Sequence, residues 1–193
     1  MKVLMINGSR RANGCTFTAL NLVALSLKEE GIDSEIVFVG ADAANGKLAE
    51  LVKSLKEKCA GADGFVFGAP VYYASPSGEI QMVLDRLFGT AGEELRGKPA
   101  AVVTSARRAG TTSALDVLAK YPSYLEMPII TSDYWTMVHG SVPEDVMKDE
   151  EGVAVLKQLG KRMAYFLKCI EAGKAAGIKA PAPAVYNKTN FIR

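Results

Sequence analysis

The sequence is poor in the residues that build metal centres and disulfide frameworks. Its 193 residues include one histidine and three cysteines, and Cys15, Cys59 and Cys169 lie far apart with no C-x-x-C pair. Their spacing therefore gives no zinc or iron–sulfur ligand set, and we expect no metal site. Three dispersed cysteines also suit a reducing cytosol better than a disulfide framework.

Long apolar runs and a strong charge bias are missing as well. No apolar run approaches about 20 residues, so we expect no membrane span. The net charge is +2 and the positive residues are dispersed, which gives no argument for a nucleic-acid partner. Lys2 leads directly into an expected strand, without the regions of a signal peptide, and we expect a cytoplasmic protein. The length and composition are those of one ordinary globular domain.

What the chain does contain is a regular alternation of short apolar runs and helical patterns. Expected strands cover residues 2–6, 34–39, 64–69, 99–105 and 127–131, with 134–138 as a continuation of the last after an interruption. Expected helices cover residues 16–30 (ended by Gly31), 47–60, 79–88, 113–121 and 150–171. This alternation predicts an α/β fold of three layers, α/β/α, around a doubly wound parallel sheet with the strand order 2-1-3-4-5.

Three loops are expected to meet at one edge of this sheet. Ligands of such sheets bind beyond the carboxyl ends of the strands, near the switch between strands 1 and 3. That rule selects residues 9–16, 70–78 and 105–112, which are all rich in small, polar or aromatic residues. We therefore expect the functional site to be formed by these loops.

The first loop has the features of an anion site. A strand, a tight loop and a helix N-terminus present backbone N–H groups to an anion, and the helix dipole adds attraction. Ser9, Asn13 and Thr16 can donate hydrogen bonds, and Arg10 and Arg11 add positive charge. We interpret this loop as a phosphate cradle; the alternative is an ordinary strand–helix connection with capping residues.

The same loop is neither of the two common nucleotide-binding motifs. Gly8 and Gly14 are one residue too far apart for a Walker P-loop, and Cys15 stands where that motif has its lysine. A G-x-G-x-x-G fingerprint is also missing. A cofactor that carries a single phosphate fits this loop better than a nucleoside triphosphate.

The other two loops offer aromatic and cationic groups. Tyr72 and Tyr73 follow a buried strand and can stack on a planar ring, or alternatively only cover the end of the sheet. Arg107 and Arg108 can steady a flavin or bind the phosphate of a nicotinamide dinucleotide. The alternative for the arginines is a solvated surface role, which we favour for at least one of the pair.

Two stretches carry a resemblance to a known family. N-G-S-x-x-x-x-G-x-T and A-P-V-Y-Y-A-S-P-S-G together resemble the flavodoxin-like NAD(P)H-dependent FMN reductases. W-T-M-V-H-G and K-D-E-E-G resemble the branch that is grouped with iron–sulfur flavoproteins, so the likeness covers about residues 1–170. It implies a flavodoxin-like FMN-binding domain over residues 1–172, NAD(P)H as co-substrate and a homodimer or homotetramer. That branch carries a compact cysteine cluster after strand 2, where this chain reads GADAANGKLAEL, so we expect the cluster to be absent.

The resemblance also implies which residues contact the cofactor. Around the FMN phosphate it places Ser9, Arg11, Asn13, Gly14, Cys15 and Thr16, with Cys15 contributing its backbone N–H. Along the isoalloxazine and ribityl chain it places Pro70, Val71, Tyr72, Tyr73 and Ala74, and on the other side Ser105, Ala106, Arg107 and Gly110. No catalytic side chain is expected, because the flavin carries the chemistry. His139 is interpreted as a structural hydrogen-bonding residue, or alternatively as a group at the flavin edge.

The expected function is transfer of hydride from NAD(P)H through FMN to a small acceptor: a quinone, a flavin, a nitroaromatic compound or a metal ion. The alternative is an electron-carrier or flavin-sensing protein that a partner protein reduces. Residues 173–193 form a C-terminal extension with the apolar residues Ile178, Val185, Tyr186, Phe191 and Ile192. We expect this extension to be an arm at a subunit interface.

Overall fold

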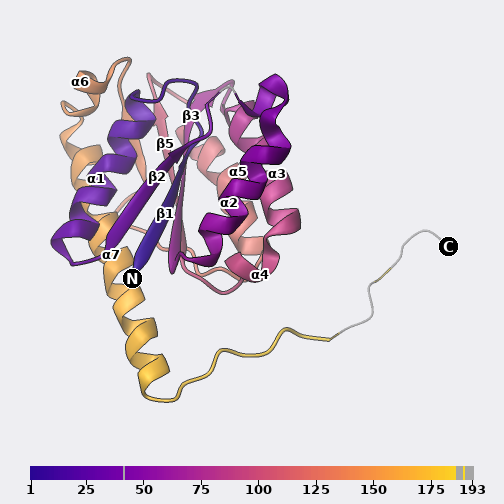
Figure 1. Ribbon diagram of the computed structural model, residues 1–193. Coiled ribbons are helices and arrows are strands. Elements are labelled where there is room, and N and C mark those ends of the chain that lie inside the picture. Colours follow the sequence, from indigo (N-terminus) through magenta and orange to yellow (C-terminus); the bar gives the residue numbers. More distant parts are fainter. Residues whose placement is uncertain (41, 186–188, 190–193) are drawn as a thin grey trace.

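A parallel sheet with the strand order β2-β1-β3-β5-β6 lies at the centre of the molecule (Figure 1). Its strands are β1 (Lys2–Asn7), β2 (Asp33–Phe38), β3 (Gly64–Tyr72), β5 (Ala100–Ala106) and β6 (Met137–His139), and the two-residue β4 (Ser75–Pro76) pairs antiparallel with the end of β3. The computed structural model describes residues 1–40, 42–185 and 189. Numbered along the chain, the five parallel strands have the order 2-1-3-4-5, which confirms the predicted topology.

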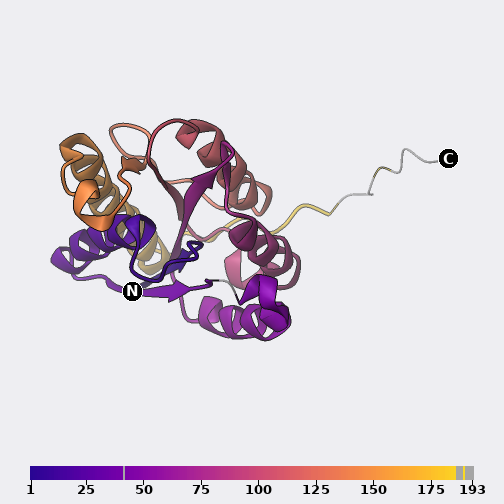
Figure 2. The same ribbon diagram turned by 90° about the horizontal axis from the view of Figure 1, so that it is seen from above.

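Helices cover both faces of this sheet (Figure 2). On one face lie α1 (Cys15–Glu29), α6 (Pro143–Val146) and α7 (Glu150–Ala175). On the other lie η1 (Ala43–Lys47), α2 (Leu48–Ala60), α3 (Gly78–Thr90), α4 (Gly92–Leu95) and α5 (Thr111–Tyr124). The three-layer α/β/α prediction is confirmed.

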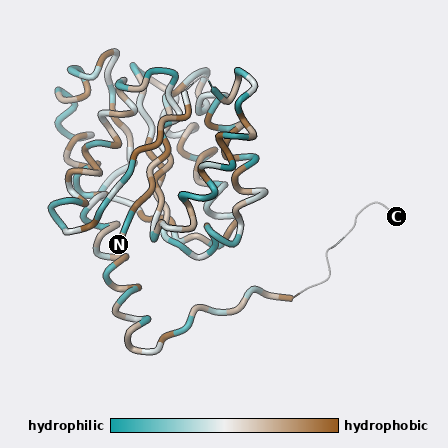
Figure 3. Tube along the Cα trace, in the orientation of Figure 1, coloured by the Kyte–Doolittle hydropathy of each residue, from teal (hydrophilic) through white to brown (hydrophobic). Residues whose placement is uncertain are grey.

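Alternation along the strands divides the core into two clusters. In β1, Leu4 and Ile6 pack toward the α2, α3 and α5 layer, and Val3 and Met5 pack toward α1 and α7. Successive side chains of a strand point to opposite faces, so a strand that is covered on both sides must be apolar throughout. The continuous hydrophobic colour of the central strands follows from this requirement (Figure 3).

The fifth parallel strand lies at the end of the predicted continuation 134–138 and not at the predicted start, 127–131. Residues 127–131 form only an isolated bridge, between Ile129 and Ala100, and the strand itself is Met137–His139. Between them, the Ser132 hydroxyl donates to the Val155 carbonyl at 2.7 Å, and Asp133 pairs with Arg162 at 2.7 Å. These two contacts hold the intervening segment to α7, so the chain leaves the edge of the sheet and rejoins it at β6.

Other elements differ from the prediction mainly at their ends. Strand β3 continues to Tyr72, α5 extends through Pro122 to Tyr124, and α7 ends at Ala175. A short π-helix, η1, occupies part of the expected loop after β2, while Ala41 of that loop lies outside the described residues. Within residues 1–40, 42–185 and 189, no helix is long and apolar enough to span a membrane.

Candidate functional site

The three predicted loops meet around one cavity at the carboxyl edge of the sheet. The cavity has a volume of ≈ 280 Å³, at the small end for a ligand site. Eleven of the predicted site residues line it: Ser9, Arg11, Gly14, Cys15, Thr16, Pro70, Val71, Tyr72, Ser105, Ala106 and Arg107. Gly140 and Ser141, from the loop after β6, also line it and were missed from the sequence. Asn13, Tyr73, Ala74 and Gly110 lie outside this lining.

Internal hydrogen bonds fix the conformation of the first loop. The buried Asn7 side chain accepts from the Ser9 N–H at 3.1 Å and donates to the Ala12 carbonyl at 3.2 Å. The Ser9 hydroxyl accepts from the Arg11 N–H at 3.0 Å. Asn7 therefore shapes the loop without lining the cavity. The sequence signals for this role were its position at the end of a buried strand and its place as the first residue of the N-G-S-x-x-x-x-G-x-T stretch.

Helix α1 directs an uncapped N-terminus at the cavity. Gly14 is its N-cap residue, and no side chain of the described residues caps the helix. The first turn also holds no acidic residue, so its free N–H groups and dipole keep their partial positive charge. Such a terminus suits an anion.

Two arginines add full positive charge to the same cavity. Among the described residues, Arg10, Arg96 and Arg162 pair with carboxylates, and Arg10 reaches Glu79 at 3.0 Å. Arg11 and Arg107 line the cavity and form no ion pair with any described carboxylate. Neither guanidinium group is therefore neutralised by an ion pair within the described residues, although Asp145 and Glu144 lie near enough to the cavity to add to the effect of burial in raising the pKa of Cys15.

A buried pair of hydroxyl groups joins the first loop to the third. Thr16 Oγ1 lies 2.8 Å from Ser105 Oγ, and both residues line the cavity. When Ser105 donates in this pair, the proton of the Thr16 hydroxyl is available to a ligand. With Ser105 as the donor, the Thr16 hydroxyl supplies a further hydrogen-bond donor beside the N–H groups of the helix.

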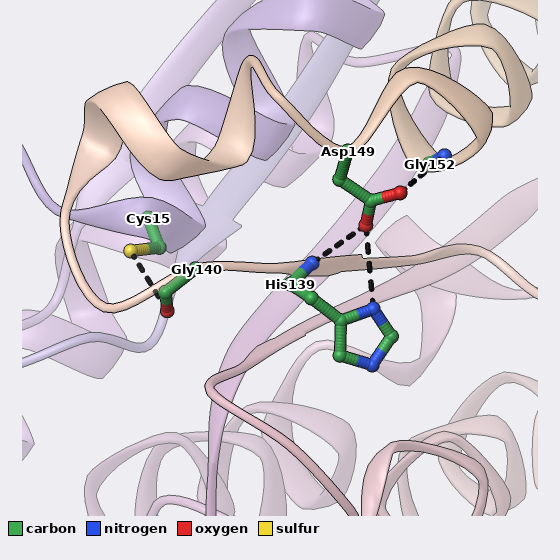
Figure 4. Close-up of polar contacts among 5 residues, drawn as sticks. All are labelled: Cys15, His139, Gly140, Asp149 and Gly152. Atoms are coloured by element: carbon green, nitrogen blue, oxygen red, sulfur yellow. Dashed lines mark hydrogen bonds and ion pairs between the residues drawn. The ribbon is translucent and has the colours of Figure 1, made fainter.

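The Cys15 thiol is directed to the backbone of the loop after β6. Its Sγ donates to the Gly140 carbonyl at 3.5 Å (Figure 4). Burial raises the pKa of the Cys15 thiol above its ordinary value, so the thiol keeps the proton that it donates. Cys15 thus fastens α1 to Gly140, a contact between residues 125 positions apart.

The second and third loops pack tightly against each other. Tyr73 and Ala74 both have positive φ, 50° and 58°, in the two-residue turn between β3 and β4. Gly110, with φ 98°, lies so close that a Cβ there would stand 2.8 Å from Ala74 Cα. Only glycine fits this contact without strain. Tyr72 is half exposed beside the cavity, while the Tyr73 side chain is fully exposed.

His139 lies beside the cavity without lining it. Asp149 Oδ2 accepts from the His139 backbone N–H at 2.8 Å and lies 3.3 Å from His139 Nδ1, while Asp149 Oδ1 accepts from the Gly152 N–H at 3.0 Å (Figure 4). Asp149 is the N-cap residue of α7. The geometry supports the structural interpretation of His139, as the end of a strand that is tied to a helix cap.

The Asp149 cap of α7 makes part of the free energy of unfolding depend on pH. Burial raises the pKa of Asp149, but the hydrogen bonds from Gly152 and His139 outweigh it and leave the pKa below the ordinary value. When folding lowers the pKa of a carboxyl group, the group stabilises the fold at pH values above its unfolded-state pKa. This contribution to the free energy of unfolding is lost as the pH falls through the folded-state pKa. We expect Asp149→Ala to lower the free energy of unfolding by about 1 kcal/mol at pH 7. In urea titrations, the difference in the free energy of unfolding between Asp149→Ala and the unmodified protein should shrink below about pH 4. A difference that stays constant down to pH 2 would contradict this prediction.

Larger hollows elsewhere on the surface lack this concentration of polar groups. One of ≈ 640 Å³ lies between α2 and α3, and one of ≈ 480 Å³ lies beside β5. The first is lined by Leu48 and Val52 but also by the cations Lys53, Lys56 and Arg86, and the second is lined by Val102 and Leu115. The first also contains the start of α2, whose first turn carries an acidic residue, whereas the first turn of α1 carries none. We place the site at the smaller cavity because the three predicted loops and the N-terminus of α1 meet there.

The cysteines do not fit an iron–sulfur cluster. Cys59 is a buried residue of α2, Cys15 packs against the core on the opposite face of the sheet, and Cys169 is exposed on α7. Thiolates on opposite faces of a sheet cannot ligate one cluster. Within the described residues, no group of three or more His, Cys, Asp or Glu side chains could hold a metal ion.

Comparison with known proteins finds flavoproteins among the relatives of this chain. The chain is 28% identical to an iron–sulfur flavoprotein of Methanocaldococcus jannaschii, over 89% of this chain and 100% of that protein. An FMN-dependent NADPH-azoreductase of Staphylococcus aureus is 31% identical over 45% of this chain and 52% of its own length.

Solved structures share the fold at lower identity. RosB, solved with a bound intermediate, 8-demethyl-8-formylriboflavin-5'-phosphate, has a TM-score of 0.68 and 15% identity, over 100% of this chain and 94% of RosB. An archaeal flavodoxin has a TM-score of 0.64 and 15% identity, over 87% of this chain and 99% of that one. These structures confirm the flavodoxin-like fold.

A family model described as NADPH-dependent FMN reductase matches residues 1–141, which include β1 to β6 and all three loops of the cavity. The match extends over most of the 193 residues. The chain therefore belongs to the NADPH-dependent FMN reductase family, and it is an oxidoreductase with FMN as its cofactor and NADPH as its electron donor.

Proposed function

We propose that this cavity binds FMN noncovalently and that the protein passes hydride from NADPH, through the flavin, to a small acceptor. The observation that carries the proposal is the uncapped N-terminus of α1, which opens into a cavity lined by Arg11 and Arg107. A phosphate group at this point satisfies the free N–H groups and balances the charge. The Thr16 hydroxyl completes the cradle.

The remaining lining suits the uncharged part of the cofactor. Pro70, Val71 and Tyr72 line the cavity from the end of β3, and Ala106 lines it from the end of the neighbouring β5. The tight contact of Gly110 with Ala74 holds the two following loops against each other. An aromatic side chain beside small residues suits a planar ring.

Hydride transfer is the chemistry that the flavin supplies when it is bound, and the side chains that line the cavity bind and orient it. They include no carboxylate and no histidine. This composition supports a role in binding and orientation, without a protein acid or base. The acceptor is then a small molecule that reaches the open side of the site.

Stopped-flow absorbance of the FMN-loaded protein tests this function. Anaerobic mixing with NADPH should bleach the flavin absorption near neutral pH, and a quinone or nitroaromatic compound should restore it. No bleaching by NADPH or NADH would contradict the proposal. Reduction by a partner protein alone would indicate the electron-carrier alternative.

We also propose that the protein is a homodimer or homotetramer and that residues 173–193 form an interface arm. The described part of this extension exposes Ile178 and Val185, whose side chains are 70% and 102% accessible. Both follow the end of α7, where the chain leaves the domain (Figure 1). Tyr186, Phe191 and Ile192, the other apolar residues of the proposed arm, lie outside the described residues.

Truncation after Gly177 tests the arm. We expect truncation to lower oligomer stability and FMN retention together, because it removes the apolar residues that the proposal docks on a partner subunit. Light scattering at tens of micromolar, before and after truncation, checks this result. A full-length monomer would contradict the assembly, and an unchanged oligomer after truncation would contradict only the role of the arm.

A further inference from the structure

The loop between β5 and α5 carries more positive charge than one phosphate in the cavity requires. Arg107 and Arg108 are adjacent there, both exposed, and neither pairs with a carboxylate of the described residues. The first turn of α5 holds no acidic residue, and no described side chain caps it. The phosphate cradle at α1 already has Arg11 and the helix N-terminus. The loop can therefore bind a second anionic group beside the first.

The two arginines occupy different positions relative to the cavity. Arg107 lines it, and Arg108, one residue further along the chain, does not. The end of the loop is fixed, because Gly110 packs directly on the turn that contains Ala74. Arg108 is therefore held at the rim of the cavity, within reach of solvent.

The size of the cavity places most of a dinucleotide outside it. At ≈ 280 Å³ it is smaller than the usual range of drug-sized ligand sites, about 300–1,000 Å³, and cannot enclose FMN and NADPH together. When the nicotinamide ring lies over the flavin, the adenosine end must extend across the rim. The 2'-phosphate that distinguishes NADPH from NADH is carried by this end.

We propose that Arg108 binds the 2'-phosphate of NADPH and so selects NADPH over NADH. A guanidinium group binds a phosphate through two parallel hydrogen bonds, and arginine serves the same purpose in other NADP sites. The proposal rests on the proposed function for the position of the nicotinamide end. It assigns to Arg108 a role in nucleotide binding and selection, without a part in hydride transfer.

Calorimetric titration of the FMN-loaded protein tests this assignment without catalysis. Adenosine 2',5'-bisphosphate carries the 2'-phosphate and AMP lacks it. The unmodified protein should bind the bisphosphate at least about tenfold more tightly, because a hydrogen-bonded phosphate–arginine pair is lost with AMP. Arg108→Ala should remove this preference and leave AMP binding unchanged, and Arg108→Lys should retain part of it.

Arg86→Ala is the matched control. Arg86 is exposed on α3, also forms no ion pair with a described carboxylate, and lines the separate hollow between α2 and α3. The Arg86→Ala variant should still bind the bisphosphate more tightly than AMP. A preference that survives Arg108→Ala, or a protein that binds both nucleotides equally, would overturn the proposal. Failure of NADPH to bleach the flavin, with the Arg108-dependent preference intact, would contradict the proposed hydride transfer and leave Arg108 as a 2'-phosphate site.

Discussion

Thr16→Ala should weaken FMN binding about 10- to 100-fold, whereas Cys15→Ala should change it little. The Thr16 hydroxyl lines the cavity and has a proton available when Ser105 donates to it. Losing a hydrogen bond to a charged group costs about 1.5–3 kcal/mol. The Cys15 thiol instead donates to Gly140, so alanine at this position keeps the backbone N–H of α1. Quenching of FMN fluorescence on titration with each apoprotein measures the affinities.

Thr18→Ala is the control on the same helix. The Thr18 hydroxyl donates to the Gly14 carbonyl at 3.3 Å and does not line the cavity. Its removal should leave FMN affinity within about twofold of the unmodified protein, because surface-type changes cost little. Equal losses for Thr16→Ala and Cys15→Ala would show that the Cys15 side chain contributes to binding.

Gly110→Ala is expected to destabilise the protein and to weaken FMN binding. Two costs combine at this position. The φ of 98° strains any residue with a Cβ, by about 1–3 kcal/mol, and the added Cβ would stand 2.8 Å from the Ala74 backbone. Relief of that contact must move the turn of Tyr73 and Ala74, and with it the end of β3, where Tyr72 lines the cavity. Urea denaturation gives the stability, and the same FMN titration gives the affinity.

Gly97→Ala separates the two costs. Gly97 has a φ of 70°, and a Cβ there would have nothing within 4 Å. The Gly97→Ala variant should therefore lose stability through backbone strain alone, and its affinity for FMN should be unchanged. If Gly110→Ala matches Gly97→Ala in both measurements, the contact between the two loops has no role in the site.

The buried strands were predictable from the sequence because burial on both faces requires a continuous apolar run. β1, β3 and β5 satisfy this requirement. The edge strand was only partly located, because the sequence placed its start at 127–131, whereas the paired strand, Met137–His139, overlaps the end of the predicted continuation 134–138. Contacts distant in sequence decide between the two segments. The Asp133–Arg162 ion pair, 29 residues apart, is one such contact. The local hydrophobic pattern of the sequence contains no information about this ion pair.

The site was predictable at the level of loops, and less so at the level of contacts. The rule for parallel sheets selected three loops, and eleven of their residues line one cavity. Gly140 and Ser141 were missed because their position depends on the bond from Cys15, 125 residues away. Nor does the sequence show that Gly110 meets Ala74. In each case the position of the residue is fixed by a tertiary contact that has no signature in the neighbouring sequence.

Binding of FMN compared with riboflavin tests the central claim most directly. The two flavins differ by the phosphate, which we place at the N-terminus of α1 beside Arg11 and Thr16. Fluorescence titration of the apoprotein should show one FMN per chain, bound at least about 100-fold more tightly than riboflavin, since several charge-assisted hydrogen bonds are lost together. Equal affinity for the two flavins, or no binding of FMN at tens of micromolar, would contradict the phosphate cradle.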